Sequence, residues 1–174
     1  QSGAAYVFVR DQGTWSEQAL LKASNPDAED LFASSLALSA DGNTLAVGAK
    51  YEDSAATEVG GDQSDNSSAD SGAAYVFARD GQGVWSQQAY IKAFNNDVDD
   101  QFGGSLALSG DGDTLAVGAE RERSCATGVG AAAQAGSNGC WYSGAVYVYV
   151  RDAQDNWAHE EYIKATNTNT DDSF

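Results

Sequence analysis

Methionine is absent from this chain of 174 residues, and proline and histidine occur once each. No stretch reaches the 18 or more apolar residues that a membrane-spanning helix needs, so we expect no membrane insertion. The single histidine, His159, lies beside Glu160 and Glu161 with no nucleophile motif, zinc pattern or phosphate-binding glycine loop nearby. We therefore predict no catalytic residues and a protein that is not an enzyme, with an exposed His159 on a strand.

Basic residues are also scarce, nine against 26 acidic ones, which gives a formal net charge of −17. A nucleic-acid backbone or an anionic membrane attracts a basic surface, so this balance argues against both partners. An acidic chain of this kind either binds cations or carries a solvated acidic surface. Both interpretations stay open at this point.

The only two cysteines, Cys125 and Cys140, lie in one Gly-, Ala- and Ser-rich segment without Cys or His neighbours at metal-binding spacing. We predict a disulfide between them, which implies an oxidising compartment and an extracellular or cell-surface protein. The alternative is a pair of free thiols in a cytosolic protein.

Glycine, with 19 residues, is abundant, and it accompanies an internal repeat of roughly 70 residues. The segment 36–49 recurs almost letter for letter as 106–119, and Ser2-Gly-Ala-Ala-Tyr-Val-Phe8 recurs at 71–77 and, with small changes, at 143–149. Single residues recur in the same order: Trp15, Trp85 and Trp157; Lys22, Lys92 and Lys164; Phe32, Phe102 and Phe174.

Each repeat is expected to form four short strands, which the middle copy places at 35–39 (A), 44–48 (B), 73–78 (C) and 87–93 (D). Asp41-Gly42 and Asp111-Gly112 predict two-residue hairpin turns with positive φ at both residues. Strand C is apolar on both faces, so both faces should be covered by stacked sheets. No segment has a 3.6-residue apolar period, and we assign no helix.

These motifs resemble the FG-GAP repeat, the blade of integrin-α-like β-propellers, and are most similar to its bacterial secreted versions. The residues that carry the resemblance are Phe102-Gly103, Leu115-Ala-Val-Gly-Ala119 and the segment 143–149. The first copy departs from the pattern, because Phe32 is followed by Ala33 instead of glycine. The resemblance implies an all-β fold of four-stranded antiparallel blades, usually seven in a ring, with an extracellular adhesive or scaffolding role.

The chain accordingly divides into about two and a half blades. We predict a half blade with strands C and D over residues 1–31, complete blades over 32–101 and 102–173, and the start of another repeat at Phe174. Two and a half blades do not close a ring. The chain is therefore expected either to be an excerpt of a longer propeller protein or to stack on identical subunits.

The resemblance also implies calcium, which many FG-GAP repeats bind in the loop between strands A and B. Here that loop is too short and too poor in acidic residues, so Asp41 and Asp111 are interpreted as turn residues. Acidic residues instead gather where strand D leads to the next strand A, and we predict a calcium site there. The candidates, led by the second group, are Asp27, Glu29 and Asp30; Asp97, Asp99 and Asp100; and Asp171 and Asp172.

Three classes of function remain at this stage. The first is a non-enzymatic structural or adhesive module, in contact with neighbouring repeats or identical subunits in a ring or filament. The second is a propeller that binds a glycan or protein through its long B-to-C loops, one of which carries a glycosylation sequon at Asn66. A hydrolase is the third class. It is disfavoured because the acidic residues of this chain repeat with the blade, whereas the pair of carboxylates that a hydrolase uses need not repeat.

Overall fold

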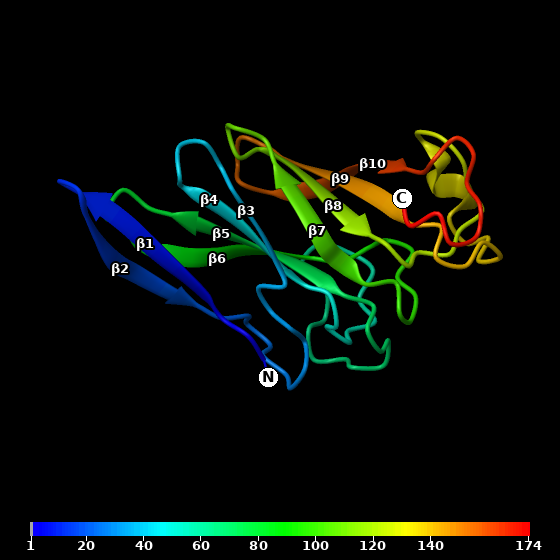
Figure 1. The fold of residues 1–174 in the computed structure, drawn as a ribbon, viewed down its shortest axis with the longest axis horizontal. Coiled ribbons are helices and arrows are strands. Elements are labelled where there is room, and N and C mark those ends of the chain that lie inside the picture. Colours follow the sequence, from blue (N-terminus) through cyan, green and yellow to red (C-terminus); the bar gives the residue numbers. More distant parts are fainter. Residues whose placement is uncertain (1) are drawn as a thin grey trace.

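The computed structural model describes residues 2–174, and its regular secondary structure consists almost entirely of antiparallel strands in three sheets (Figure 1). The N-terminal sheet pairs β1 (Ala5–Asp11) with β2 (Thr14–Leu21). The middle sheet has the order β3-β4-β5-β6 and the C-terminal sheet the order β10-β9-β8-β7. Their strands are β3 (Ser35–Leu38), β4 (Thr44–Ala49), β5 (Ala73–Arg79), β6 (Trp85–Ile91), β7 (Phe102–Leu108), β8 (Thr114–Ala119), β9 (Ala145–Arg151) and β10 (Trp157–Ile163). The all-β prediction of four-stranded antiparallel units is confirmed.

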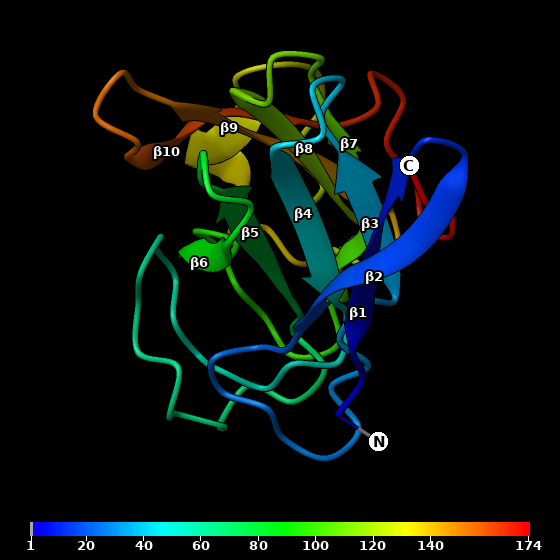
Figure 2. The same ribbon diagram turned by 90° about the vertical axis from the view of Figure 1, so that its left-hand side faces the viewer.

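The three sheets lie in a row, with the N-terminal sheet at one end and the C-terminal sheet at the other (Figures 1 and 2). Two apolar clusters join them. One packs Leu21 of β2 with Val47 and Tyr75 of the middle sheet. The other packs Val76 and Ile91 of the middle sheet with Tyr147 of the C-terminal sheet. Strand C of the middle sheet is therefore buried on both faces, as its apolar composition predicts.

Consecutive sheets are also joined by backbone contacts of the repeated phenylalanine, which precedes β3 in the middle sheet and opens β7 in the C-terminal sheet. Phe32 and Phe102 form isolated parallel bridges with Gly3 and Gly72 of the preceding sheet, and the N–H of Phe174 donates to the Ser143 carbonyl. The contact is so close that a Cβ on Gly72 would lie 2.1 Å from the carbonyl oxygen of Phe102. Glycine is required there because no side chain fits between the two backbones.

Three local predictions need correction. The A–B hairpins reverse over four residues, 40–43 in the middle sheet, and positive φ is found at Gly42 and not at Asp41. Strand D begins at Trp85 instead of residue 87, because Trp85 pairs directly with Arg79, and it ends at Ile91. One short 3-10 helix, η1 (Ala131–Gln134), occurs in the segment between the two cysteines, where no helix was expected.

Asp41 does hold its turn. Its carboxylate accepts hydrogen bonds from the Ser39 hydroxyl and from the backbone and side-chain amides of Asn43. The bond from Ser39, followed by those from Asn43, lowers the pKa of Asp41 to about 2. Asp111 makes the equivalent bonds with Ser109 and Asp113.

Candidate interaction surface

The N-terminal sheet exposes an aromatic face on the side away from the middle sheet. Tyr6, Phe8, Trp15 and Leu20 are 59%, 52%, 64% and 50% exposed, and the strand register places them on one side of the sheet. Their counterparts in the other two sheets lie at inter-sheet contacts and are nearly all buried: Tyr75, Phe77, Trp85 and Tyr90; Tyr147, Tyr149, Trp157 and Tyr162. Contiguous exposed apolar side chains of this kind mark an interaction surface.

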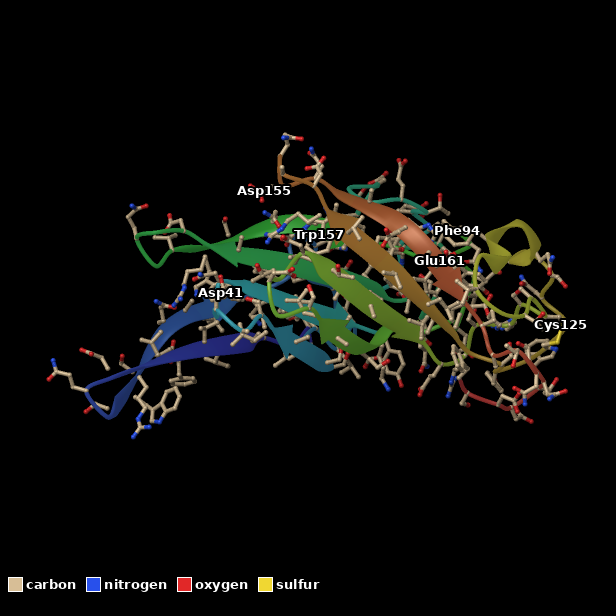
Figure 3. All side chains as sticks on the ribbon, turned by 90° about the horizontal axis from the view of Figure 1, so that it is seen from above. Asp41, Phe94, Cys125, Asp155, Trp157 and Glu161 are labelled. Atoms are coloured by element: carbon tan, nitrogen blue, oxygen red, sulfur yellow. A yellow bond between two sulfur atoms is a disulfide. The ribbon has the colours of Figure 1, made fainter. Side chains whose placement is uncertain are left out.

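A repeated polar contact crosses both junctions between sheets. The indole N–H of Trp85 donates to Oε1 of Gln18 at 2.9 Å, and that of Trp157 donates to Oε1 of Gln88 at the same distance. Arg151 reinforces the second contact, because it lies over the Trp157 ring and also donates to Gln88. Trp157 is labelled in Figure 3, where the middle and C-terminal sheets meet.

The acceptor glutamines occupy β-bulges. Gln18 and Gln88 are the extra residues at the register shifts of β2 and β6, and a bulge turns a side chain away from the regular alternation of a strand. β10 has the same bulge, between His159 and Glu161, and its extra residue is Glu160. Glu160 therefore lies where an acceptor for the next sheet is expected, and it is exposed.

The far face of the C-terminal sheet, on the side away from the middle sheet, is half-buried and largely apolar. Val146, Val148 and Ile163 occupy the positions at which Ala74, Val76 and Ile91 of the middle sheet pack against the C-terminal sheet. A shallow hollow of about 230 Å³ lies on this far face, lined by residues that include Ala107, Ala116 and Val146. The molecule thus ends in two apolar faces of different shape.

Two buried ion pairs fix the repeats internally, and sequence reasoning missed their acidic partners. Lys92 Nζ lies 2.9 Å from Oε2 of Glu52, and Lys164 Nζ lies 2.6 Å from Oε2 of Glu122. All four side chains are buried. The signal was present, because both glutamates stand three residues after the repeated Leu-Ala-Val-Gly-Ala segment.

The first repeat lacks this pair. Lys22, the counterpart of Lys92, is exposed and donates to the carbonyl of Gly3 at 2.6 Å. Within residues 2–174 the N-terminal sheet contains only the counterparts of strands C and D, whereas in the other sheets the loop after strand B carries Glu52 and Glu122.

The acidic connections mainly hold their own turns. The carboxylates of Asp30, Asp100 and Asp172 each accept the backbone N–H of the residue three positions earlier. Burial is the main cause that raises the pKa of Asp100 to about 8, and the charge of Glu122 adds to it. Asp30 is buried too, and its pKa is raised in the same way.

The remaining predicted calcium ligands point to separate partners. Asp99 pairs with Arg121 at 2.8 Å, Asp97 accepts from Asn138, and Asp27 accepts from Asn66. Glu29 and Asp171 are exposed residues with positive φ.

Across residues 2–174, no group of three or more His, Cys, Asp or Glu side chains is arranged to hold a metal ion. As arranged here, these oxygens do not converge on one ion, and calcium binding stays a prediction.

The two cysteines form the predicted disulfide, with an S–S distance of 2.10 Å and a sequence separation of 15. It lies in the B-to-C loop of the last repeat, at the end of the molecule opposite the N-terminal sheet (Figure 3). This loop also runs along the outer edge of the sheet, because Val129 bridges Ile163 of β10. Around Ile163 this edge therefore no longer offers free backbone groups to other strands.

His159 is not an exposed strand residue, contrary to the prediction. It is half-buried in edge-on contact with Phe94 and Tyr149, and burial lowers its pKa. Its Nε2 atom is buried without a hydrogen-bond partner in the structure. The histidine therefore packs between the middle and C-terminal sheets as an aromatic side chain.

Asn66, the residue of the glycosylation sequon, lies on an exposed loop, where its amide donates to Asp27 at 2.7 Å. Within residues 2–174, none of the helical segments has the length and hydropathy that spanning a membrane requires.

The antiparallel sheets stack in a row that does not close into a ring over residues 2–174, and the two complete sheets have four strands each. This arrangement defines a propeller-type repeat module. The family model of the FG-GAP repeat matches residues 15–77, from the start of β2 through most of β5. This segment therefore carries an FG-GAP repeat, and the predicted resemblance to that repeat is confirmed, whereas the likeness to its bacterial secreted versions stays a prediction. FG-GAP repeats are typically extracellular, and the disulfide is consistent with that environment. No curated protein matches the chain.

Proposed function

We propose that this chain is a non-enzymatic, extracellular structural module whose two terminal faces are covered by identical subunits or neighbouring repeats. The observation that carries this proposal is the aromatic face of Tyr6, Phe8, Trp15 and Leu20. In the next two sheets, the residues at the same positions pack against the preceding sheet. The exposed face of the N-terminal sheet therefore has the composition of a protein interface. Covering it removes apolar surface from water and stabilises the assembly.

Self-association is the direct test. Sedimentation velocity over a wide concentration range should show reversible growth beyond the monomer. Because each chain carries a formal charge of −17, repulsion opposes stacking, and association should strengthen from about 0.02 M to about 0.5 M salt as charges are screened. A chain that stays monomeric under all these conditions would contradict assembly from identical subunits.

A second candidate function is recognition of a glycan or protein through the B-to-C loops. It is favoured by an open hollow of about 560 Å³, lined by Ser24, Asn25, Asp27, Gln63 and Ser64 among others. Its polar lining suits a hydroxyl-rich ligand, whereas most small-molecule sites are more enclosed and more apolar. Glycan-array binding that is lost in Asn25→Ala would support this role, and no binding to any glycan would remove the glycan form of it.

Calcium binding and glycosylation at Asn66 accompany the proposal as separate questions. A bound ion at the acidic connections would raise the melting temperature by mass action. An equal melting temperature in excess calcium and in excess chelator would remove the calcium proposal. Intact mass of the protein from its native source decides whether Asn66 carries a sugar.

A further inference from the structure

We infer that Glu160 is the acceptor through which the C-terminal sheet of one copy binds Arg10 and Trp15 of a second copy. This inference rests on the proposed function and adds the residues that set register and polarity. Head-to-tail contact of this kind buries the aromatic face of one copy against the far face of the other. It is a heterologous interface, which grows into an open filament or a closed ring.

The same polar contact occurs twice inside the chain. At both junctions between sheets, the bulge residue of strand D accepts the indole N–H of the tryptophan that opens strand D in the following sheet. At both junctions an arginine at the end of strand C also reaches the same acceptor: Arg79 reaches Gln18 and Arg151 reaches Gln88. Acceptor, tryptophan and arginine thus form one unit that occurs twice.

The two halves of a third unit lie at opposite ends of the part of the chain that the structure describes (Figure 1). Arg10 pairs with Trp15 in the register of β1 and β2, as Arg151 pairs with Trp157 in β9 and β10. Both side chains are exposed on the aromatic face, and within residues 2–174 the Arg10 guanidinium donates a hydrogen bond only to the nearby Gly13 carbonyl. At the other end of the molecule, Glu160 occupies the bulge, and none of the sheets described here lies on the side that it faces.

The charges of the two surfaces also favour this contact. The internal acceptors are neutral amides, whereas Glu160 is a carboxylate, so its contact with an arginine becomes an ion pair. A chain with only nine basic residues that places one of them on its aromatic face is locally complementary to this carboxylate. A second copy of the chain supplies arginine and tryptophan at the spacing that the two internal junctions already use.

The experiment compares the self-association of charge-reversal variants by sedimentation velocity. Glu160→Arg and Arg10→Glu should each weaken association at least about tenfold, because each places like charges at the junction. The double variant restores opposite charges and should recover association to within about threefold of the wild type. Glu160→Gln, which copies the internal acceptors, should bind more tightly than Glu160→Ala. Glu58→Arg, on an exposed loop, serves as the matched control.

The outcomes distinguish the Glu160 contact from the proposed assembly of identical subunits. If the wild type associates and neither reversal weakens it beyond the Glu58→Arg control, the Glu160 contact is wrong while the proposed assembly stands. If the reversals weaken association but the double variant does not recover it, the direct pairing of residues 10 and 160 is wrong. A wild type that remains monomeric overturns both and leaves a further repeat of the same type as the occupant of the face.

Discussion

The Lys92 ammonium group lies 2.9 Å from the Glu52 carboxylate, and both side chains are buried beneath the B-to-C loop of the middle repeat. Burial lowers the pKa of Lys92, and the charge of Glu52 opposes that effect. Glu52 also accepts from Asn25 and Tyr90. The Glu52 carboxylate therefore links the B-to-C loop to strand D and to the connection that carries Asn25. We infer that the ion pair organises the repeat in this way.

Removing that carboxylate should be strongly destabilising. Glu52→Gln leaves a buried ammonium without its counter-charge, and we expect a loss of about 3–5 kcal/mol in the free energy of unfolding by urea. Glu58→Gln, on the exposed part of the same loop, should change stability by less than about 0.5 kcal/mol. A loss at Glu52 no larger than that at Glu58 would show that the pair has no organising role.

The disulfide should stabilise the last repeat. Replacing both Cys125 and Cys140 with serine removes a closed loop of 15 residues, and the chain-entropy estimate for such a loop is about 3 kcal/mol. Reducing agent should destabilise the wild type by a similar amount and leave the double variant unchanged. Two free thiols in freshly isolated protein would contradict both the bond and the extracellular proposal.

Asp100 should make stability depend on pH. Its pKa is raised to about 8 by burial, so the folded protein binds a proton there more tightly than the unfolded chain does. The stabilising contribution is complete below the unfolded pKa near 4 and is lost as pH rises to about 8, with a slope of at most about 1.4 kcal/mol per pH unit.

Asp100→Asn keeps an oxygen for the N–H of Asp97 and removes the ionisable group. The difference in stability between variant and wild type should therefore move in favour of the variant as pH rises from 4 to 8. A difference that does not change with pH, measured by urea unfolding at several pH values, would refute the raised pKa.

Ala33 holds a conformation that suits glycine. Its φ is 71°, and its counterpart in the next repeat is Gly103 with φ 87°. Ala33→Gly relieves the left-handed strain at a smaller entropic cost, so we expect a gain of about 0.5–1 kcal/mol. Gly103→Ala should cost at least about 2 kcal/mol, since its Cβ would lie 2.3 Å from the Ala73 carbonyl oxygen.

The control for this pair is Ala28→Gly, at an exposed position outside the positive-φ set. It should be neutral or slightly destabilising. Thermal unfolding of the three variants checks the order. Ala33→Gly falling below Ala28→Gly would mean that the neighbouring sheets do not hold residue 33 in this conformation.

The sheets could be predicted from the sequence because each strand pattern occurs two or three times in the chain. A pattern that recurs in the same order is easily distinguished from a chance one. Strand C, apolar on both faces, predicted stacking correctly. The A–B turns were mispredicted, since Asp-Gly is compatible with more than one hairpin loop and the hydroxyl of Ser39 selects the longer one.

The interaction site was less accessible to sequence reasoning. Trp15 and Glu160 are far apart in the chain, and their relation becomes visible only through the contacts of Trp85 and Trp157 with the bulge residues Gln18 and Gln88. A bulge depends on strand register, which residue types alone do not specify. The acidic connections were predicted to bind calcium because of their charge. Several of their carboxylates instead accept backbone N–H groups within turns that the sequence did not reveal.

Hydrogen–deuterium exchange at two protein concentrations tests most directly whether the terminal faces are covered by other copies. Well above the association threshold, residues 5–21 and the β10 segment 157–163 should exchange more slowly than in dilute solution. Segment 73–79, already buried between sheets, should not change. Equal exchange of 5–21 and 157–163 at both concentrations, in a sample that sedimentation shows to be associated, would contradict the proposed stacking.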